Sequence, residues 1–126
     1  MYCIDATSGT ILWTGEVPTA PGGAAPDVME DTGLAASTMA TDGVRVYAIF
    51  PTGDIAAFDF NGRLLWYKSL GTPNNLYGHA ASLEVWQDSV FVQYDQALVE
   101  DNKSVLYAFN GATGNILWDA KRPLAN

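Results

Sequence analysis

The sequence predicts an all-β fold made of repeated four-stranded antiparallel sheets. A segment that ends in Leu-Trp occurs three times within 126 residues. The segments and the stretches between them are rich in β-branched and aromatic residues, and glycine or proline interrupts them at short intervals, as in strands joined by tight turns. No stretch carries apolar residues at helical spacing over three turns. Helices therefore offer no competing account of the pattern.

Each copy of the repeated segment has a strand, a polar turn that contains glycine, and a second strand. The copies are residues 2–13 (YCIDATSGTILW), 55–66 (IAAFDFNGRLLW) and 106–118 (LYAFNGATGNILW). Their last residues, Trp13, Trp66 and Trp118, recur at intervals of 53 and 52 residues. A repeat of about 50 residues is typical of the blades of a β-propeller.

A second pair of segments gives the order of the strands within one blade. Residues 33–37 (GLAAS) match residues 78–82 (GHAAS) at an offset of 45, and the apolar pattern of 44–48 returns at 89–93. The strands of a blade are then A (near 34–41 and 79–86), B (44–50 and 89–94), C (55–59 and 105–109) and D (63–68 and 115–119). Asp42-Gly43 and Gln87-Asp88 are suited to tight turns between strands A and B. Four antiparallel strands in this meander order form one blade.

We expect residues 1–126 to form a partial β-propeller of about two and a half blades. Residues 1–14 would give strands C and D of a first blade, 34–69 a second blade and 78–121 a third, with a long loop at 15–33. Closed propellers typically have 4–8 blades, so we expect the chain to be a segment of a larger propeller. Exposed strand edges favour pairing with other strands. The expected partners are the remaining blades or copies of this chain.

The third segment resembles the tryptophan-docking repeat of PQQ-like propellers, the family of quinoproteins and BamB-like proteins. That motif reads Ala-x-Asp-x-x-Thr-Gly-x-x-x-Trp, and residues 108–118 fit it with Asn110 in place of the aspartate. The first copy has Cys3 for the alanine and Ser8 for the threonine, and the second copy has a turn that is one residue shorter. The resemblance covers nearly the whole chain and implies the fold. It does not select one activity, since fold alone does not decide function.

The repeated residues are predicted to be structural. A short polar side chain before each turn can accept hydrogen bonds from backbone N–H groups two or three residues on, and a glycine supplies the positive φ that such turns require. By resemblance, the tryptophans pack between neighbouring blades. The residues with these roles are Asp5, Gly9 and Trp13, then Asp59, Gly62 and Trp66, then Asn110, Gly114 and Trp118.

Composition and charge exclude several classes of function. Six Lys and Arg against 14 Asp and Glu give a net charge of −8, which repels nucleic acid because affinity for phosphate comes largely from Lys and Arg. No apolar stretch approaches the roughly 20 residues that a membrane-spanning helix needs. A single cysteine, Cys3, excludes an internal disulfide and a cysteine-cluster metal site. Motifs of common hydrolases, nucleotide-binding proteins and zinc enzymes do not occur.

The candidate ligand-binding residues lie in the longer connections, which a meander blade places on one face. In the D–A and B–C connections these are Asp27, Glu30, Asp31, Glu100 and Asp101. They could bind a cation or a basic partner, but no calcium-loop spacing occurs, and solvated loop charge is the favoured interpretation. Tyr77 and His79 lie where strand A begins. His79 could act as a base or ligand, although a lone histidine without a partner is more often structural.

Two functions follow from the resemblance. The favoured one is a non-catalytic binding scaffold, with a protein or glycan partner and no cofactor in this segment. The alternative is part of a PQQ-dependent alcohol or sugar dehydrogenase, in which PQQ and calcium would be the cofactors. The sequence places no catalytic aspartate, calcium ligand or adjacent cysteine pair for that alternative. The resemblance also favours a periplasmic or secreted location.

Overall fold

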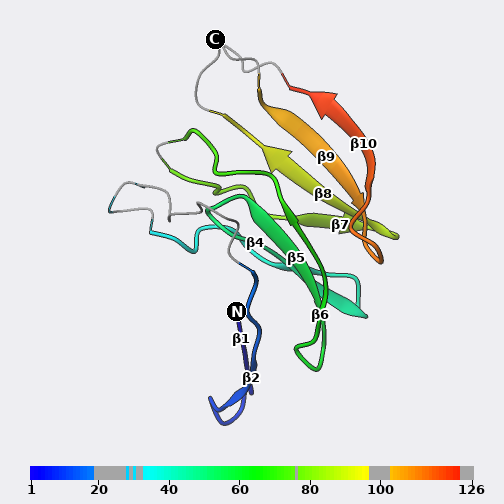
Figure 1. Cartoon of the computed structure of the whole chain (residues 1–126). Coiled ribbons are helices and arrows are strands. Elements are labelled where there is room, and N and C mark those ends of the chain that lie inside the picture. The colour runs from blue at the N-terminus through cyan, green and yellow to red at the C-terminus, as the bar shows by residue number, and fades with distance from the viewer. Residues whose placement is uncertain (19–27, 29, 31–32, 76, 97–102, 123–126) are drawn as a thin grey trace.

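Ten strands in three antiparallel sheets make up the computed structural model, which describes residues 1–18, 28, 30, 33–75, 77–96 and 103–122. The sheets fan out one after another along the chain (Figure 1). The first is a hairpin of β1 (Tyr2–Ile4) and β2 (Ile11–Thr14). The described residues contain no helix, and so none that could cross a membrane.

The second and third sheets are four-stranded meanders, in which each strand pairs with the next one in sequence. The second consists of β3 (Ala40–Thr41), β4 (Arg45–Ile49), β5 (Asp54–Asp59) and β6 (Leu64–Ser69). The third consists of β7 (Glu84–Trp86), β8 (Ser89–Tyr94), β9 (Val105–Asn110) and β10 (Ile116–Lys121). The predicted all-β propeller fold, with strands in A–B–C–D order, is therefore confirmed.

The first strand of each four-stranded sheet is shorter than the sequence predicts. Strand A was expected over 34–41 and 79–86, but β3 begins at Ala40 and β7 at Glu84. The preceding segments bond to each other and not to their own sheets. Thr38 N–H donates to Ser82 Oγ (3.2 Å), and Leu83 N–H donates to the Thr38 carbonyl (3.3 Å). Since these backbone groups are satisfied across the two sheets, they do not extend the strands.

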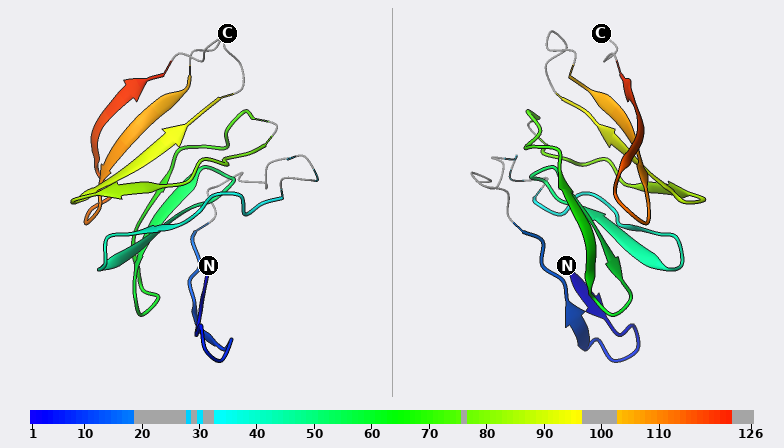
Figure 2. Two further views of the ribbon diagram at one scale, coloured as in Figure 1. Left: turned by 180° about the vertical axis from the view of Figure 1, so that it is seen from behind. Right: turned by 45° about the vertical axis from the view of Figure 1, so that its right-hand side comes forward.

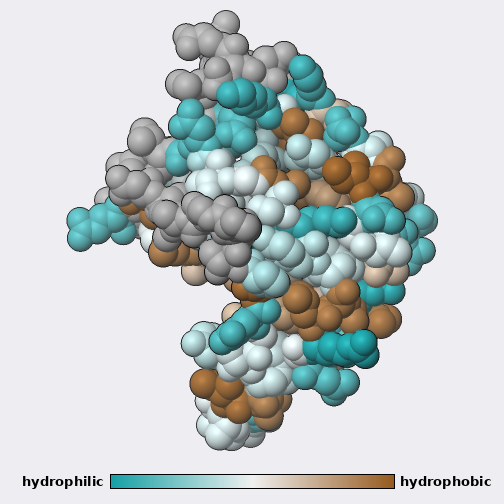
Figure 3. Space-filling view, viewed as in Figure 1, coloured by the Kyte–Doolittle hydropathy of each residue, from teal (hydrophilic) through white to brown (hydrophobic). Residues whose placement is uncertain are grey.

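The main core lies between the second and third sheets, which face each other in both views of Figure 2. The second sheet contributes Tyr47, Ile49, Ile55, Ala57 and Trp66. The third contributes Val90, Val92, Tyr94 and Phe109, and Leu83, just before its first strand, completes the cluster. Burial falls toward the ends of the fan: β5 is buried over almost all its length, whereas every residue of β10 is exposed. Figure 3 shows apolar side chains at the surface over β10 and over the first hairpin.

A tryptophan joins each sheet to the next one. The Trp13 indole lies over the second sheet's β5–β6 turn, with its ring carbons 2.7 Å from where a Cβ on Gly62 would lie. The Trp66 indole lies in the same way over the third sheet's β9–β10 turn, 2.6 Å from the corresponding position on Gly114. Any side chain at these two glycines would therefore displace a tryptophan. The glycines have φ of 83° and 68°, which also disfavours other residues.

Candidate ligand-binding site

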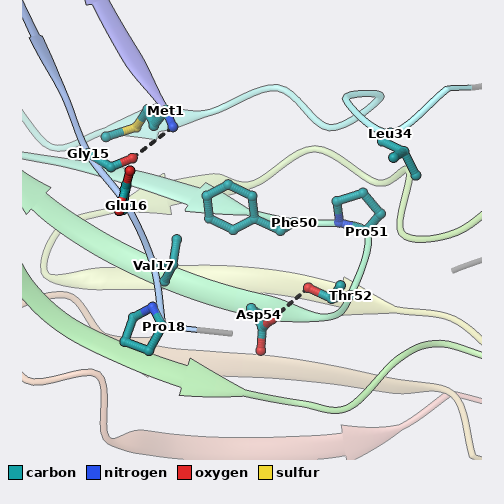
Figure 4. A pocket seen from close by; sticks show the side chains of 10 residues that line it. All are labelled: Met1, Gly15, Glu16, Val17, Pro18, Leu34, Phe50, Pro51, Thr52 and Asp54. Carbon is teal, nitrogen blue, oxygen red and sulfur yellow. Dashed lines mark hydrogen bonds between the residues drawn. The ribbon is translucent and has the colours of Figure 1, made fainter. Parts of the chain in front are cut away.

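The connections between β4 and β5, between β6 and β7 and between β8 and β9 leave the sheets on one face, opposite the tight turns. On this face an open cavity of about 510 Å³ lies between the first hairpin's exit and the β4–β5 turn. Such a volume is within the range of small-molecule sites. The lining residues are Met1, Gly15, Glu16, Val17, Pro18, Leu34, Phe50, Pro51, Thr52 and Asp54, drawn in Figure 4.

Asp54 is the buried polar group of this cavity. It opens β5, and only 5% of its surface is exposed. Its Oδ2 accepts a 2.6 Å hydrogen bond from the Thr52 hydroxyl, and its Oδ1 accepts one of 2.9 Å from the Tyr67 hydroxyl. Burial and the neighbouring Asp54 carboxylate both raise the pKa of Tyr67, which keeps that hydroxyl a donor. Two fixed donors thus hold the carboxylate in place beside the cavity.

The turn that carries Asp54 is fixed by close packing between the second and third sheets. Gly53 has a φ of 79°, and a Cβ there would lie 1.8 Å from the Gly71 carbonyl oxygen. The Tyr94 hydroxyl donates to that same oxygen from the third sheet. Leu70 N–H donates to the Gly53 carbonyl at 3.0 Å. Only glycine fits at position 53, so the wall of the cavity depends on this contact between sheets.

No ion pair neutralises Asp54 within the part of the chain that the structure describes. A second carboxylate, that of Glu16, lines the same cavity, while Phe50, Pro51, Val17 and Leu34 supply apolar walls. A buried carboxylate without a cation is costly unless its hydrogen bonds are satisfied, and it attracts a positively charged group that enters. The arrangement is therefore suited to a ligand with a cationic group and an apolar body.

His79 lies in the third sheet's entry segment, and it does not line this cavity. Only 5% of its surface is exposed, its Nε2 lies 2.9 Å from the Ala81 carbonyl oxygen, and its ring stacks on Tyr94 with centroids 5.7 Å apart. Burial lowers the pKa of the imidazole. The lowered pKa favours the neutral ring, and the tautomer with its hydrogen on Nε2 donates to the Ala81 carbonyl.

Two of the other sequence-predicted ligand residues, Tyr77 and Glu30, lie among the described residues. Tyr77 is 54% exposed, and its backbone N–H binds the Asn75 side chain. Glu30 is exposed. Asp27, Asp31, Glu100 and Asp101 lie outside the described residues. Among the described ones, no three His, Cys, Asp or Glu side chains gather closely enough to hold a metal ion.

Asp54, Glu16 and Tyr67 were not among the residues predicted from the sequence. One signal was present: Thr52-Gly-Asp54 is a tight turn followed directly by the apolar run 55–58. A carboxylate at the start of a fully buried strand has to be buried with its own donors. The partner Tyr67 lies on β6, opposite Ala56 in the register, and this proximity can be read only from the strand pairing.

The comparisons with known proteins agree on one fold. The family described as outer membrane protein assembly factor BamB matches residues 1–126. BamB from Moraxella catarrhalis superposes with a TM-score of 0.62 at 20% identity, over 94% of this chain and 29% of that one. A europium-containing methanol dehydrogenase superposes at 0.69 with 21% identity, over 94% of this chain and 20% of that one. The chain thus spans less than a third of either structure. No curated protein matches it in sequence.

Proposed function

Because the chain belongs to the family of the outer membrane protein assembly factor BamB, we propose that it is a non-catalytic propeller module that binds a cationic group of a partner. The supporting observation is the buried, hydrogen-bonded Asp54 carboxylate in the wall of an open, otherwise largely apolar cavity. The partner would be a protein that inserts a lysine or arginine side chain, or a small organic amine. The acidic chain, with a net charge of −8, would attract such a partner.

The alternative, a segment of a quinoprotein dehydrogenase, is supported by the structural likeness to a methanol dehydrogenase. The donor set of the cavity argues against it. Calcium requires six to eight oxygen ligands, whereas the described lining residues offer two carboxylates, those of Asp54 and Glu16, and the first already accepts two hydrogen bonds. PQQ is itself a polycarboxylate, and the same two side chains would repel it. The residues present do not fit either group, and we propose that this segment holds no cofactor.

Titration calorimetry with hexylamine as the cationic probe tests the proposal, with 1-hexanol as the neutral analogue. We expect hexylamine to bind and hexanol to bind much more weakly. Asp54→Asn should weaken hexylamine binding about tenfold or more, since a hydrogen-bonded charge contributes about 1.5–3 kcal/mol. Asp88→Asn is the matched control, because Asp88 is exposed in the β7–β8 turn and does not line the cavity. Equal affinities for amine and alcohol would contradict the proposal.

A short lysine-containing peptide in place of hexylamine separates the two sources of the cationic group. Tighter binding of the peptide than of the free amine would identify a protein partner. The dehydrogenase alternative has its own readout: dye reduction with an alcohol or sugar donor that depends on added PQQ and calcium. Such a reaction would overturn the binding-only function.

We also propose that the module works outside the cytoplasm, in the periplasm or beyond, as the family's association with outer-membrane assembly suggests. Fractionation of the source cells, followed by immunodetection of the chain, tests this. Recovery in the cytoplasmic fraction alone would contradict it.

A further inference from the structure

We propose that a second cavity, between the end of β6 and the β9–β10 turn, binds a carboxylate that is carried on a short apolar body. Figure 1 shows this turn beside β6, and the cavity between them has a volume of about 210 Å³. Its lining comes from residues 68–70 of the second sheet and from 109 and 114–116 of the third. It shares no lining residue with the Asp54 cavity, so the inference is independent of the ligand proposed above.

Lys68 lies on the face of β6 that is directed at the third sheet. Side chains alternate along a strand, and Trp66 and Leu70, two residues before and after Lys68, both pack in the core between the sheets. The cross-strand partner of Lys68 is Ile55, which is fully buried in the same core. Lys68 is nevertheless exposed, since the cavity lies between β6 and the third sheet at this position.

The repeat does not require a lysine at this position. Two residues after the tryptophan, the first copy has Gly15 and the third copy has Ala120. That glycine lets the backbone lie close to the second sheet, because a Cβ on Gly15 would lie 2.7 Å from the Phe58 ring. Phe109 is the matching residue of the third sheet, and it lines the cavity together with Lys68. The packing of neighbouring sheets therefore does not explain the lysine.

Lys68 and Asn115 bring unused hydrogen-bond donors to the cavity. Among the residues that the structure describes, neither side chain makes a hydrogen bond or an ion pair. An ammonium has three N–H donors and a side-chain amide has two. The described lining residues include no Asp or Glu. A carboxylate only accepts hydrogen bonds, and its bonds from a charged donor are stronger than neutral ones, so it is suited to this pair of donors.

The apolar part of the lining sets the size of the ligand. It consists of Leu70, Phe109 and Ile116. The cavity volume equals that of about seven water molecules at about 30 Å³ each, enough for a carboxylate with a tail of about three carbons. Phosphate or sulfate would leave the apolar side chains in contact with water. The ligand class is therefore a short aliphatic carboxylate, either a free acid or the C-terminus of a chain that ends in an apolar residue.

The net charge of −8 works against any anion. At physiological ionic strength, however, exposed charges more than about 8 Å apart are largely screened, whereas Lys68 would contact the ligand directly. We therefore expect binding in the millimolar range.

Titration of the whole isotope-labelled chain with butyrate, followed by NMR, tests this, with 1-butanol as the neutral analogue. Butyrate should shift the backbone amide signals of Ser69 and Asn115 until they saturate, and butanol should bind much more weakly. Lys68→Met keeps an apolar stem without the charge and should weaken butyrate binding about fivefold. Lys68→Arg should largely retain it. Acetate, with two fewer CH₂ groups to bury, should bind about tenfold more weakly than butyrate.

The matched control is Lys121→Met, which removes another exposed lysine that does not line the cavity. This variant should bind butyrate as the unmodified chain does. Equal affinities of Lys68→Met and the unmodified chain would overturn the proposal, and so would signal shifts that do not saturate.

The peptide acetyl-Gly-Gly-Val, with its C-terminal amide as control, distinguishes the two sources of the carboxylate. Tighter binding of the free-acid peptide than of butyrate would identify the C-terminus of a partner chain. Weaker binding would identify a small acid. Equal binding of the peptide acid and its amide would contradict recognition of a carboxylate.

Discussion

The Trp66 indole of the second sheet donates a 2.7 Å hydrogen bond to the Gly111 carbonyl of the third, and its ring closes over Gly114. The two glycines have complementary uses, because one offers a backbone acceptor and the other leaves room for the ring. Gly111 also allows the Tyr47 hydroxyl to approach closely. The contact between the two sheets is therefore specified by large side chains of the second sheet and by glycines, which have no side chain, in the third.

Replacement of this tryptophan should be among the most damaging changes in the chain. Trp66 is 8% exposed and belongs to the main core, so Trp66→Ala should lower the free energy of unfolding by about 3–5 kcal/mol. Trp66→Phe keeps most of the ring and loses the N–H donor, and it should cost less. Trp86→Ala, at 65% exposure, is the control and should change little. Urea titrations followed by circular dichroism measure all three.

Substitution of the turn glycine should act through the tryptophan as well as through the backbone. Gly114→Ala places a methyl group 2.6 Å from the Trp66 ring in a turn with φ of 68°. Gly43→Ala imposes the same backbone penalty, about 1–2 kcal/mol, at a position with open space. We expect Gly114→Ala to lower the melting temperature clearly more than Gly43→Ala. Equal effects would mean that the ring moves aside without cost.

The contribution of Asp42 to the stability of the fold should be lost at acidic pH. Burial opposes ionisation, but hydrogen bonds from the Tyr47 hydroxyl, from two backbone N–H groups and from the Arg45 guanidinium together lower the pKa of Asp42 to about 2 from 3.8. The folded state favours the ionised form, so this contribution is complete above pH 4 and is lost as the pH falls toward 2. Asp42→Asn should therefore be less stable than the original at pH 7, with a difference that shrinks below pH 4 in urea titrations.

Protonation of His79 should lower the stability of the fold at a higher pH than protonation of Asp42 does. Burial lowers its pKa below the usual 6.5, so the unfolded chain takes up the proton first. The stabilisation that depends on the neutral ring is complete above about pH 6.5 and declines as the pH falls toward the folded-state pKa. His79→Phe keeps a ring to stack on Tyr94 and cannot be protonated. Between pH 7 and 5 its melting temperature should fall less than that of the original chain; a parallel fall would contradict this role.

The repeat made the sheets predictable, because the Leu-Trp segments and their glycine turns are local signals that also determine how neighbouring sheets pack. Strand length was less predictable. Residues 34–39 and 79–83 have strand-like composition, yet their polar groups bond between the two sheets, as Thr38 does to Ser82. Local composition does not distinguish a strand in a sheet from an extended segment between sheets.

The candidate site depends on residues that local sequence signals do not connect. The buried carboxylate of Asp54 lies in a short turn, and its donor Tyr67 is 13 residues away on another strand. His79, the one histidine of the chain, was a candidate ligand residue on the basis of its residue type. Its ring stacks on Tyr94. Chemical residue type alone did not reveal which side chains the strand register brings together.

The contact of Trp66 with the third sheet has a consequence for synthesis of the chain. Trp66 completes the second sheet, but its acceptor Gly111 is 45 residues further on. At typical elongation rates of about 5–20 residues per second, the indole remains without its partner for roughly 2–9 seconds after it is made. The second sheet therefore leaves the ribosome with an uncovered aromatic surface, which the third sheet then buries. During that interval the nascent chain is open to chaperones and to neighbouring chains.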